Sequence, residues 1–314
     1  MSSAPLYEDI LEGPLNGQAE WLETKDKFKI RVAHWNQSKS KGTIFLFPGR
    51  NEYIEKYGRT CKILQKMGYG SLIVDWRGQG LSDRLLKNKL IGHIDEFEDY
   101  QNDVDELIKF AHKKKFKKPW HLIGHSMGGA IGLRALLNGL PVKKVIFSSP
   151  MWDIKMHQNS IFDKLLHFYI KKSYIFYKIR KKENSFVPST NKTPYLSTKN
   201  FENNTLTTDQ NYFIYLKNQI LKYPNLALAG PSIKWVHTAL NECKNLQKIV
   251  PPKTPCLTFC SKNDKIVNNV AIEKIMRKWP KGKLTYINDA EHEVLMENDD
   301  LLKMIYSDID EFLN

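Results

Sequence analysis

Apolar and polar residues alternate in two short stretches near the N-terminus, Ala19–Glu23 and Phe28–His34. A period of two is typical of strands that are buried on one face. The polar residues at Thr24–Lys27 predict a turn that joins the two strands as an antiparallel pair. The run Thr43–Phe47 is almost wholly apolar, which predicts a buried strand. The chain is therefore expected to open with the first strands of a sheet.

Beyond this point the period changes repeatedly between that of a helix and that of a short buried strand. The expected helices are 53–67, 97–113, 127–138, 233–246, 270–279 and 301–312, and the expected strands are 71–75, 121–124, 144–148, 256–259 and 283–287. Strands that alternate with helices of this length indicate a doubly wound, mostly parallel sheet with helices on both faces. The sequence thus predicts the α/β class.

The alternation is interrupted between residues 152 and 229. This segment is rich in Lys, Asn, Tyr and Phe and has a mainly helical pattern. An insertion between consecutive strands, placed at their C-terminal ends, lies where open α/β sheets bind ligands. We therefore expect a core formed by residues 1–151 and 230–314, with a helical cap at 152–229 acting as a lid.

The segment Gly124–Gly129, with the sequence GHSMGG, fits the G-x-S-x-G pattern of a nucleophile elbow. Such an elbow needs a strand that turns sharply into a helix, so that the serine hydroxyl is raised above the sheet, and small residues on either side avoid a clash. A predicted strand precedes the motif and a predicted helix follows it. Ser126 is therefore the expected nucleophile.

The partners of an elbow serine follow it along the chain, first an acid and then a histidine. His292 is the last histidine in the sequence and comes just after the last predicted strand, which makes it the expected base. Asp264 follows the strand 256–259 and is the expected acid, where it can hold the imidazole in one tautomer. Asp289 and Glu291 compete by proximity to His292, although their short tether makes the approach awkward.

Acyl transfer at a serine also requires two N–H groups that face the developing negative charge. We expect one from Met127, at the start of the helix after the serine, and the other from Arg50, in the loop after the strand 43–47. Gly49 would allow close approach in that loop. The residues expected to bind substrate are Gly49, Glu52, His93, His125 and Trp152. His125 should point away from the serine.

These segments resemble the bacterial lysophospholipases related to monoacylglycerol lipases. The resemblance is carried from about residue 45 to 297 by the motifs at 47–52, 75–84, 92–93, 124–129, 148–151, 206–209, 230–232 and 291–296. It implies an α/β-hydrolase fold with a helical cap, no metal or other cofactor, and hydrolysis of a single-chain glycerolipid. The chain departs from the family's usual pattern at Pro48, where histidine is common, and at 266–269, which lacks a common aspartate.

Composition adds one consideration about partners. The chain carries 48 Lys and Arg residues against 34 Asp and Glu, a formal net charge of +14. Within 152–229 twelve basic residues stand against five acidic ones and are interleaved with aromatic and aliphatic residues. This pattern suits either an ordinary cap helix or a surface that rests on anionic lipid headgroups. Nucleic-acid binding is not expected, because no base-reading or stacking motif accompanies the charge.

The cysteines favour a reducing compartment. The four cysteines of the chain have no CxxC spacing, so they predict buried thiols rather than a zinc site. We find no signal-like start and no apolar run long enough to span a bilayer. A cytoplasmic location is expected, with contact at the inner face of the membrane as an extension of the lipid-binding interpretation.

Several functions are compatible with these residues. Hydrolysis of a lysophospholipid or monoacylglycerol through an acyl-enzyme is the leading prediction. A general carboxylesterase or acyltransferase could use the same three residues. An aminopeptidase would need acidic cap residues to bind the substrate ammonium, whereas this cap is basic. A binding protein without activity would normally have lost Ser126, Asp264 or His292, and all three are present.

Overall fold

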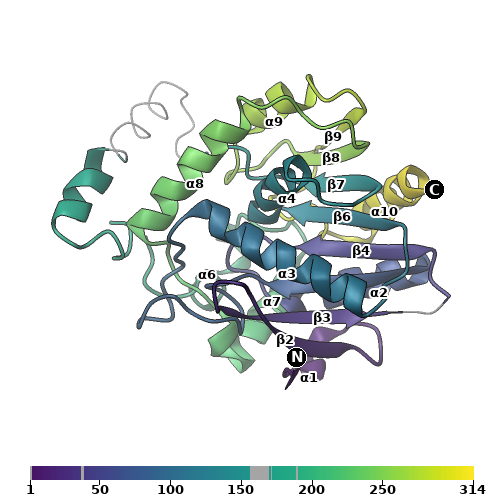
Figure 1. Ribbon diagram of the computed structural model, residues 1–314, viewed down its shortest axis with the longest axis horizontal. Coiled ribbons are helices and arrows are strands. Elements are labelled where there is room, and N and C mark those ends of the chain that lie inside the picture. Colours follow the sequence, from purple (N-terminus) through teal and green to yellow (C-terminus); the bar gives the residue numbers. More distant parts are fainter. Residues whose placement is uncertain (1, 37–38, 156–169, 171, 189) are drawn as a thin grey trace.

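The computed structural model describes residues 2–36, 39–155, 170, 172–188 and 190–314 (Figure 1). Its centre is a nine-stranded sheet in the order β1-β2-β3-β5-β4-β6-β7-β8-β9. The strands are β1 (Ser2–Ser3), β2 (Gln18–Glu23), β3 (Lys29–Trp35), β4 (Gly42–Phe47), β5 (Tyr69–Asp75), β6 (Trp120–His125), β7 (Lys144–Ser148), β8 (Cys256–Ser261) and β9 (Gly282–Ile287). Every strand expected from the sequence is present, extended by a few residues at most.

The sheet is antiparallel at one edge and parallel elsewhere. β2 and β3 form the expected antiparallel pair, closed by a turn in which the Thr24 N–H donates to the Phe28 carbonyl at 2.9 Å. β3 also runs antiparallel to β5, and all pairs from β5 across to β9 are parallel. Parallel strands place their C-terminal ends at one edge of the sheet, and loops at that edge are where α/β proteins bind ligands.

Helices cover both faces of this sheet (Figure 1). The α-helices are α1 (Glu8–Leu11), α2 (Gly58–Lys66), α3 (Tyr100–Lys113), α4 (Met127–Leu137), α6 (Tyr195–Thr198), α7 (Gln210–Lys222), α8 (Ile233–Leu246), α9 (Asn269–Met276) and α10 (Asp299–Leu313). The described residues also form four short 3₁₀ helices, η1 (Ile54–Tyr57), η2 (Phe97–Asp99), η3 (Phe201–Asn203) and η4 (Pro224–Leu226).

Two hydrophobic clusters form the core, one on each face of the sheet. Along β4, Phe45 and Phe47 belong to one cluster, and Ile44 and Leu46 belong to the other. This is the alternation that a strand buried on both faces requires. Helices α3, α4, α8 and α9 pack in the first cluster, whereas α2, α7 and α10 pack in the second.

The expected helix at 53–67 is divided in the structure. It begins as η1 and continues as α2 from Gly58. A Cβ built on Gly58 would lie 1.6 Å from the Leu11 carbonyl oxygen. Glycine at this position therefore lets the backbone of the N-terminal segment pack directly against the start of α2. The spacing of apolar residues predicts a helix, but it does not indicate that a segment distant in the sequence packs against it.

One helix of the insertion, α7, packs against the core. In α7 the hydroxyl of Tyr215 donates to the Leu11 carbonyl at 2.8 Å, and the Gln219 amide donates to the Ile10 carbonyl at 2.7 Å. Leu216 is fully buried in the second cluster. Residues 172–179 form a further helical stretch near the periphery of the fold (Figure 1). Part of the expected cap, at 156–169, 171 and 189, lies outside the described residues, and the division into core and cap stays a prediction.

Candidate active site

Ser126 occupies a sharp turn between β6 and α4. Its backbone has φ 50° and ψ −117°, a conformation that costs a non-glycine residue of order 1–3 kcal/mol. Hydrogen bonds hold the turn: the Ser126 N–H donates to the Ser148 carbonyl at 3.0 Å, and the Met151 N–H donates to the Ser126 carbonyl at 2.8 Å. The surrounding structure therefore enforces the strained backbone that an elbow serine needs.

The flanking glycines have a steric reason. A Cβ on Gly128 would lie 1.9 Å from the carbonyl oxygen of Phe47, and a Cβ on Gly124 would lie 2.9 Å from the Gly128 carbonyl oxygen. Both distances are too short for any side chain. The spacing of the motif is thus set by how closely α4 approaches β4 and β6.

The structure brings Ser126, His292 and Asp264 together. The Oγ of Ser126 is 2.9 Å from Nε2 of His292, and Nδ1 of the same ring is 2.7 Å from Oδ2 of Asp264. The other carboxylate oxygen of Asp264 accepts the N–H groups of Ile266 at 2.8 Å and Val267 at 3.0 Å. The three side chains come from loops after β6, β8 and β9, and all three are buried.

The two competing acids lie elsewhere. Glu291 is paired with Lys265 at 3.0 Å, and its backbone N–H donates to Glu297 at 2.8 Å. The backbone carbonyl of Asp289 accepts a hydrogen bond from Thr208 at 3.4 Å. Within the described residues neither carboxylate contacts the His292 ring, whereas Asp264 does.

Charge favours proton transfer from Ser126 to His292. Burial alone would lower the pKa of His292, but the charge and hydrogen bond of Asp264 outweigh it, so the pKa is raised. Burial would raise the pKa of Asp264, yet its contacts with His292 and two backbone N–H groups lower it. Asp264 is therefore ionised at neutral pH and stabilises the imidazolium.

The loop after β4 lies against the serine. A Cβ on Gly49 would be 3.1 Å from Cβ of Ser126, so glycine permits this approach. In the described part of the chain, the backbone N–H groups of Met127 and Arg50 donate to no protein acceptor. Unpaired N–H groups in such a position beside Ser126 could bind an oxyanion, and their role as an oxyanion hole stays a prediction.

A buried ionic network supports this loop. The Glu52 carboxylate accepts the N–H of Gly49 and, at 2.6 Å, the hydroxyl of Tyr57. The Lys56 ammonium lies between Glu52 at 2.6 Å and Glu293 at 2.5 Å. Glu293 is the residue after His292, so Lys56 ties the Gly49 loop to the histidine loop.

One set of donors among the described residues has the spacing of a metal site. The ligand atoms of Glu52, His125 and Glu293 lie within 4.8 Å of one another. The Lys56 ammonium already contacts both carboxylates of this set. A divalent cation would have to displace it, and the set is better described as a lysine site than as a metal centre.

Replacing Lys56 by methionine should destabilise the fold strongly. The change leaves Glu52 and Glu293 close together, buried and without their cation, which costs about 3–5 kcal/mol. Urea unfolding should report this loss. Lys303→Met is the matched control, because its pair with Asp300 is exposed and its removal should change stability by about 0.5 kcal/mol or less. Equal losses in the two variants would contradict the role of Lys56.

The other expected substrate-binding residues have different surroundings. His125 contacts the Ser148 carbonyl through Nδ1 at 3.0 Å, its ring centroid lies 4.9 Å from that of His292, and burial lowers its pKa to about 4. His93 is bound to Ser232 at 2.7 Å. Contacts of these two rings with a substrate stay a prediction.

Trp152 lies in the core rather than on an open surface. It has no exposed area, packs against Phe147 and Trp279, and donates to the Gly129 carbonyl at 3.3 Å. This placement gives the indole a part in supporting the start of α4. A contact of Trp152 with substrate stays a prediction, because sequence pattern does not distinguish a pocket wall from the core behind it.

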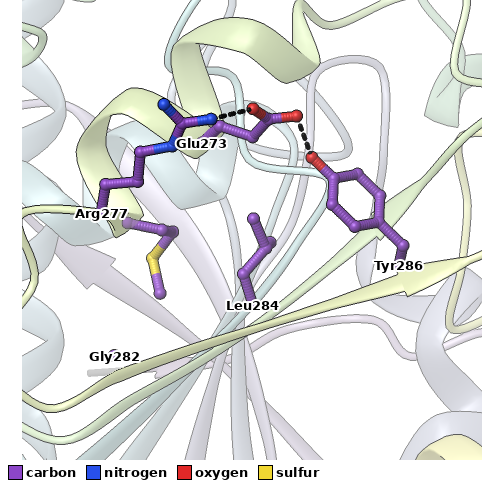
Figure 2. Close-up of a pocket in the computed structure, with 6 residues that line it drawn as sticks. Glu273, Arg277, Gly282, Leu284 and Tyr286 are labelled. Atoms are coloured by element: carbon purple, nitrogen blue, oxygen red, sulfur yellow. Dashed lines mark hydrogen bonds and ion pairs between the residues drawn. The ribbon is translucent and has the colours of Figure 1, made fainter.

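A cavity of about 380 Å³ lies away from these residues, between α9 and β9 (Figure 2). Figure 2 shows Glu273 between two partners: its carboxylate accepts the Tyr286 hydroxyl, and Arg277 contacts it at 3.2 Å. Neither Ser126 nor His292 lines this cavity. It forms no part of the candidate active site.

The mostly parallel sheet, the strained serine between β6 and α4, and the histidine after the last strand define an α/β-hydrolase fold. Residues 38–299 match the family described as serine aminopeptidase, S33, and the chain belongs to that family.

Individual relatives are lipases by name. The chain is 29% identical over 304 residues to a probable lysophospholipase L2 of Haemophilus influenzae, covering 94% of this chain and 91% of the relative. It is 25% identical over 301 residues to lysophospholipase L2 of Escherichia coli, covering 92% and 85%. A crystal structure of a soluble variant of Saccharomyces cerevisiae monoglyceride lipase, in complex with a substrate analogue, superposes with a TM-score of 0.72 at 20% identity, covering 94% of both chains.

Proposed function

We propose that this protein is a serine esterase that hydrolyses the carboxylic ester of a single-chain glycerolipid, a lysophospholipid or a monoacylglycerol. The observation that carries the proposal is the unbroken hydrogen-bonded series from Ser126 through His292 to Asp264. A serine hydroxyl is a weak nucleophile until an adjacent base takes its proton. This arrangement supplies the base, and the buried carboxylate orients it.

The reaction has two halves. Oγ of Ser126 bonds to the acyl carbon while its proton passes to Nε2 of His292, and the N–H groups of Met127 and Arg50 stabilise the oxyanion. His292 then protonates the glycerol oxygen, which leaves as the C–O bond breaks. Water attacks the acyl-enzyme in the second half, giving its proton to His292, and the fatty acid leaves as Ser126 recovers a proton. Each oxyanion donor contributes about 3 kcal/mol.

The substrate class rests on the relatives. The relatives are named as lysophospholipases and a monoglyceride lipase. The substrates in these names have in common an ester of one fatty acyl chain on a glycerol unit. A general carboxylesterase would use the same residues with small esters. The family description names an aminopeptidase, but the acidic residues that would bind a substrate ammonium are scarce in 152–229, where basic residues predominate.

A substrate panel separates these classes. We expect kcat/KM to rise along a series of p-nitrophenyl esters by up to about fourfold per added methylene, since each buried methylene contributes about 0.8 kcal/mol. Lysophospholipids and monoacylglycerols of the same chain length should be cleaved with release of fatty acid. A preference for acetyl or butyryl esters would favour the general carboxylesterase, and turnover of aminoacyl anilides would favour the aminopeptidase.

We also propose that the helical stretch 172–179 contacts an anionic lipid surface. It exposes Ile175, Phe176 and Ile179 at 55%, 50% and 77%. Exposed basic residues lie within the stretch, at Lys178, and directly after it, at Arg180, Lys181 and Lys182. Exposed apolar side chains beside cations are typical of helices that rest in the headgroup region of a membrane. No described helix is long and apolar enough to cross the bilayer.

Vesicle flotation tests this contact. The protein should float with vesicles containing phosphatidylglycerol and should dissociate as salt is raised, because screening weakens the attraction. Ile179→Ser should weaken binding by about tenfold, the loss expected from one fully buried aliphatic side chain. Leu15→Ser is the matched control, since Leu15 is 86% exposed on a different segment. Binding that ignores lipid charge, salt and Ile179 would exclude the proposal.

A further inference from the structure

The side chain of Arg50 extends from the loop beside the serine to the segment before α8. Its Nη2 donates to the Ala229 carbonyl at 2.6 Å, and the guanidinium carbon lies 5.2 Å from the Trp235 ring centroid. A Cβ on Gly92 would be 2.8 Å from Nη2, so the neighbouring backbone lies directly against the guanidinium. The group is therefore held in one place by its surroundings.

This cation has no carboxylate partner among the described residues. Arg50 is half-buried, whereas the two fully buried arginines have acidic partners: Arg31 pairs with Glu55 and Asp75, and Arg77 pairs with Asp26 and Asp103. Within the same residues Arg50 has the Ala229 carbonyl as its one hydrogen-bond acceptor, and its Nε is buried without an acceptor.

Such a group is costly to bury and is usually kept for a reason. Burial lowers the pKa of Arg50 to about 10, so the guanidinium is still charged at neutral pH. An unpaired cation with unused N–H donors is suited to an anionic ligand, and guanidinium binds phosphate with geometric selectivity.

The position of Arg50 identifies which anion is relevant. Arg50 follows Gly49, and a Cβ on Gly49 would lie 3.1 Å from Cβ of Ser126, so the Arg50 side chain starts from a loop that packs against the serine. In a lysophospholipid the phosphate is separated from the ester carbonyl by only a few bonds. A monoacylglycerol carries a neutral hydroxyl at the corresponding place.

We propose that the Arg50 side chain binds the phosphate of a lysophospholipid and so determines selectivity for that substrate over a monoacylglycerol. The inference rests on the proposed esterase function and assigns it a specificity residue. Its backbone N–H would act on the oxyanion while its side chain recognises the headgroup.

The test compares two substrates with the same acyl chain, oleoyl-lysophosphatidylglycerol and mono-oleoylglycerol, in mixed detergent micelles. In Arg50→Met the ratio of kcat/KM for the phospholipid to that for the monoacylglycerol should fall by about 10- to 100-fold, the loss expected for a charged hydrogen bond. The change should lie mainly in KM for the phospholipid. Arg50→Lys should restore part of the ratio, because it keeps the charge without the planar donors.

Arg84→Met is the matched control. Arg84 also lacks a carboxylate partner among the described residues, but its donors are satisfied by the carbonyls of Gly78, Gly80 and Asn225. The ratio should be unchanged in this variant. An equal fall in both substrates for Arg50→Met would assign the side chain a purely structural role and overturn the inference. Failure of the wild type on both substrates would instead contradict the esterase function itself.

Discussion

Replacing Ser126 by alanine should lower kcat for ester hydrolysis on the order of 10⁶-fold, the scale found when the nucleophile of a serine hydrolase is removed. The substitution removes the atom that forms the acyl-enzyme and leaves His292 and Asp264 in place. Steady-state release of fatty acid measures the loss. Thermal unfolding should be little changed, because alanine keeps the backbone of the turn and its hydrogen bonds with Ser148 and Met151.

Ser149→Ala provides the control for this prediction. Ser149 is buried close to the same strand ends, and its Oγ has no hydrogen-bond partner in the described part of the chain. Its removal should leave most of the activity. If the Ser126 variant kept a substantial fraction of wild-type turnover while the Ser149 variant lost it, the nucleophile would have to be sought elsewhere.

Asp264→Asn should lower kcat by about 10⁴-fold and shift the pH dependence. The base works in its neutral form, so the rate falls as pH falls through the pKa of His292. Asp264 raises that pKa, and replacing its charge by an amide lowers it. The acid limb of the kcat/KM profile should therefore move to lower pH even as the maximal rate collapses.

Glu291→Gln separates this result from a general effect of removing charge. Glu291 precedes His292 but is paired with Lys265, so its removal should shift neither the rate nor the acid limb by a comparable amount. A large loss in Glu291→Gln with a small loss in Asp264→Asn would reassign the acid. Circular dichroism of both variants shows whether the fold is retained.

The elements that carry the reacting groups could be predicted because their causes are local. The glycines at 124 and 128 mark a turn in which any larger side chain would strike the backbone. The alternation of apolar runs and helical periods predicted every strand of the parallel part of the sheet. Asp264 and His292 could be predicted because each comes directly after a predicted strand, and parallel strands end at the same edge of the sheet.

The supporting contacts could not be predicted because they join residues far apart in the sequence. Lys56 and Glu293 are separated by 237 positions. The spacing of four residues between Glu52 and Lys56 was a visible sign of an ion pair, but nothing local indicated Glu293 as a second partner. Gln79 was missed in the same way: its amide donates to the Gly49 carbonyl at 2.8 Å and helps to fix the loop.

The residues against which the insertion packs could also not be predicted from the sequence pattern. The period of α7 is that of an amphipathic helix whether its apolar face covers a substrate or joins the core. Its polar contacts with Leu11 and Ile10 show that this helix packs against the N-terminal segment. Tertiary partners of an amphipathic face are not encoded in its period.

Covalent labelling shows whether Ser126 is the activated nucleophile. The folded protein should react with a fluorophosphonate probe, and mass spectrometry of the digested adduct should place one modification on Ser126. Labelling should disappear after denaturation and in the Ser126→Ala variant. A folded, substrate-hydrolysing protein whose adduct maps to another residue, or that forms no adduct, would show that Ser126 is not the nucleophile.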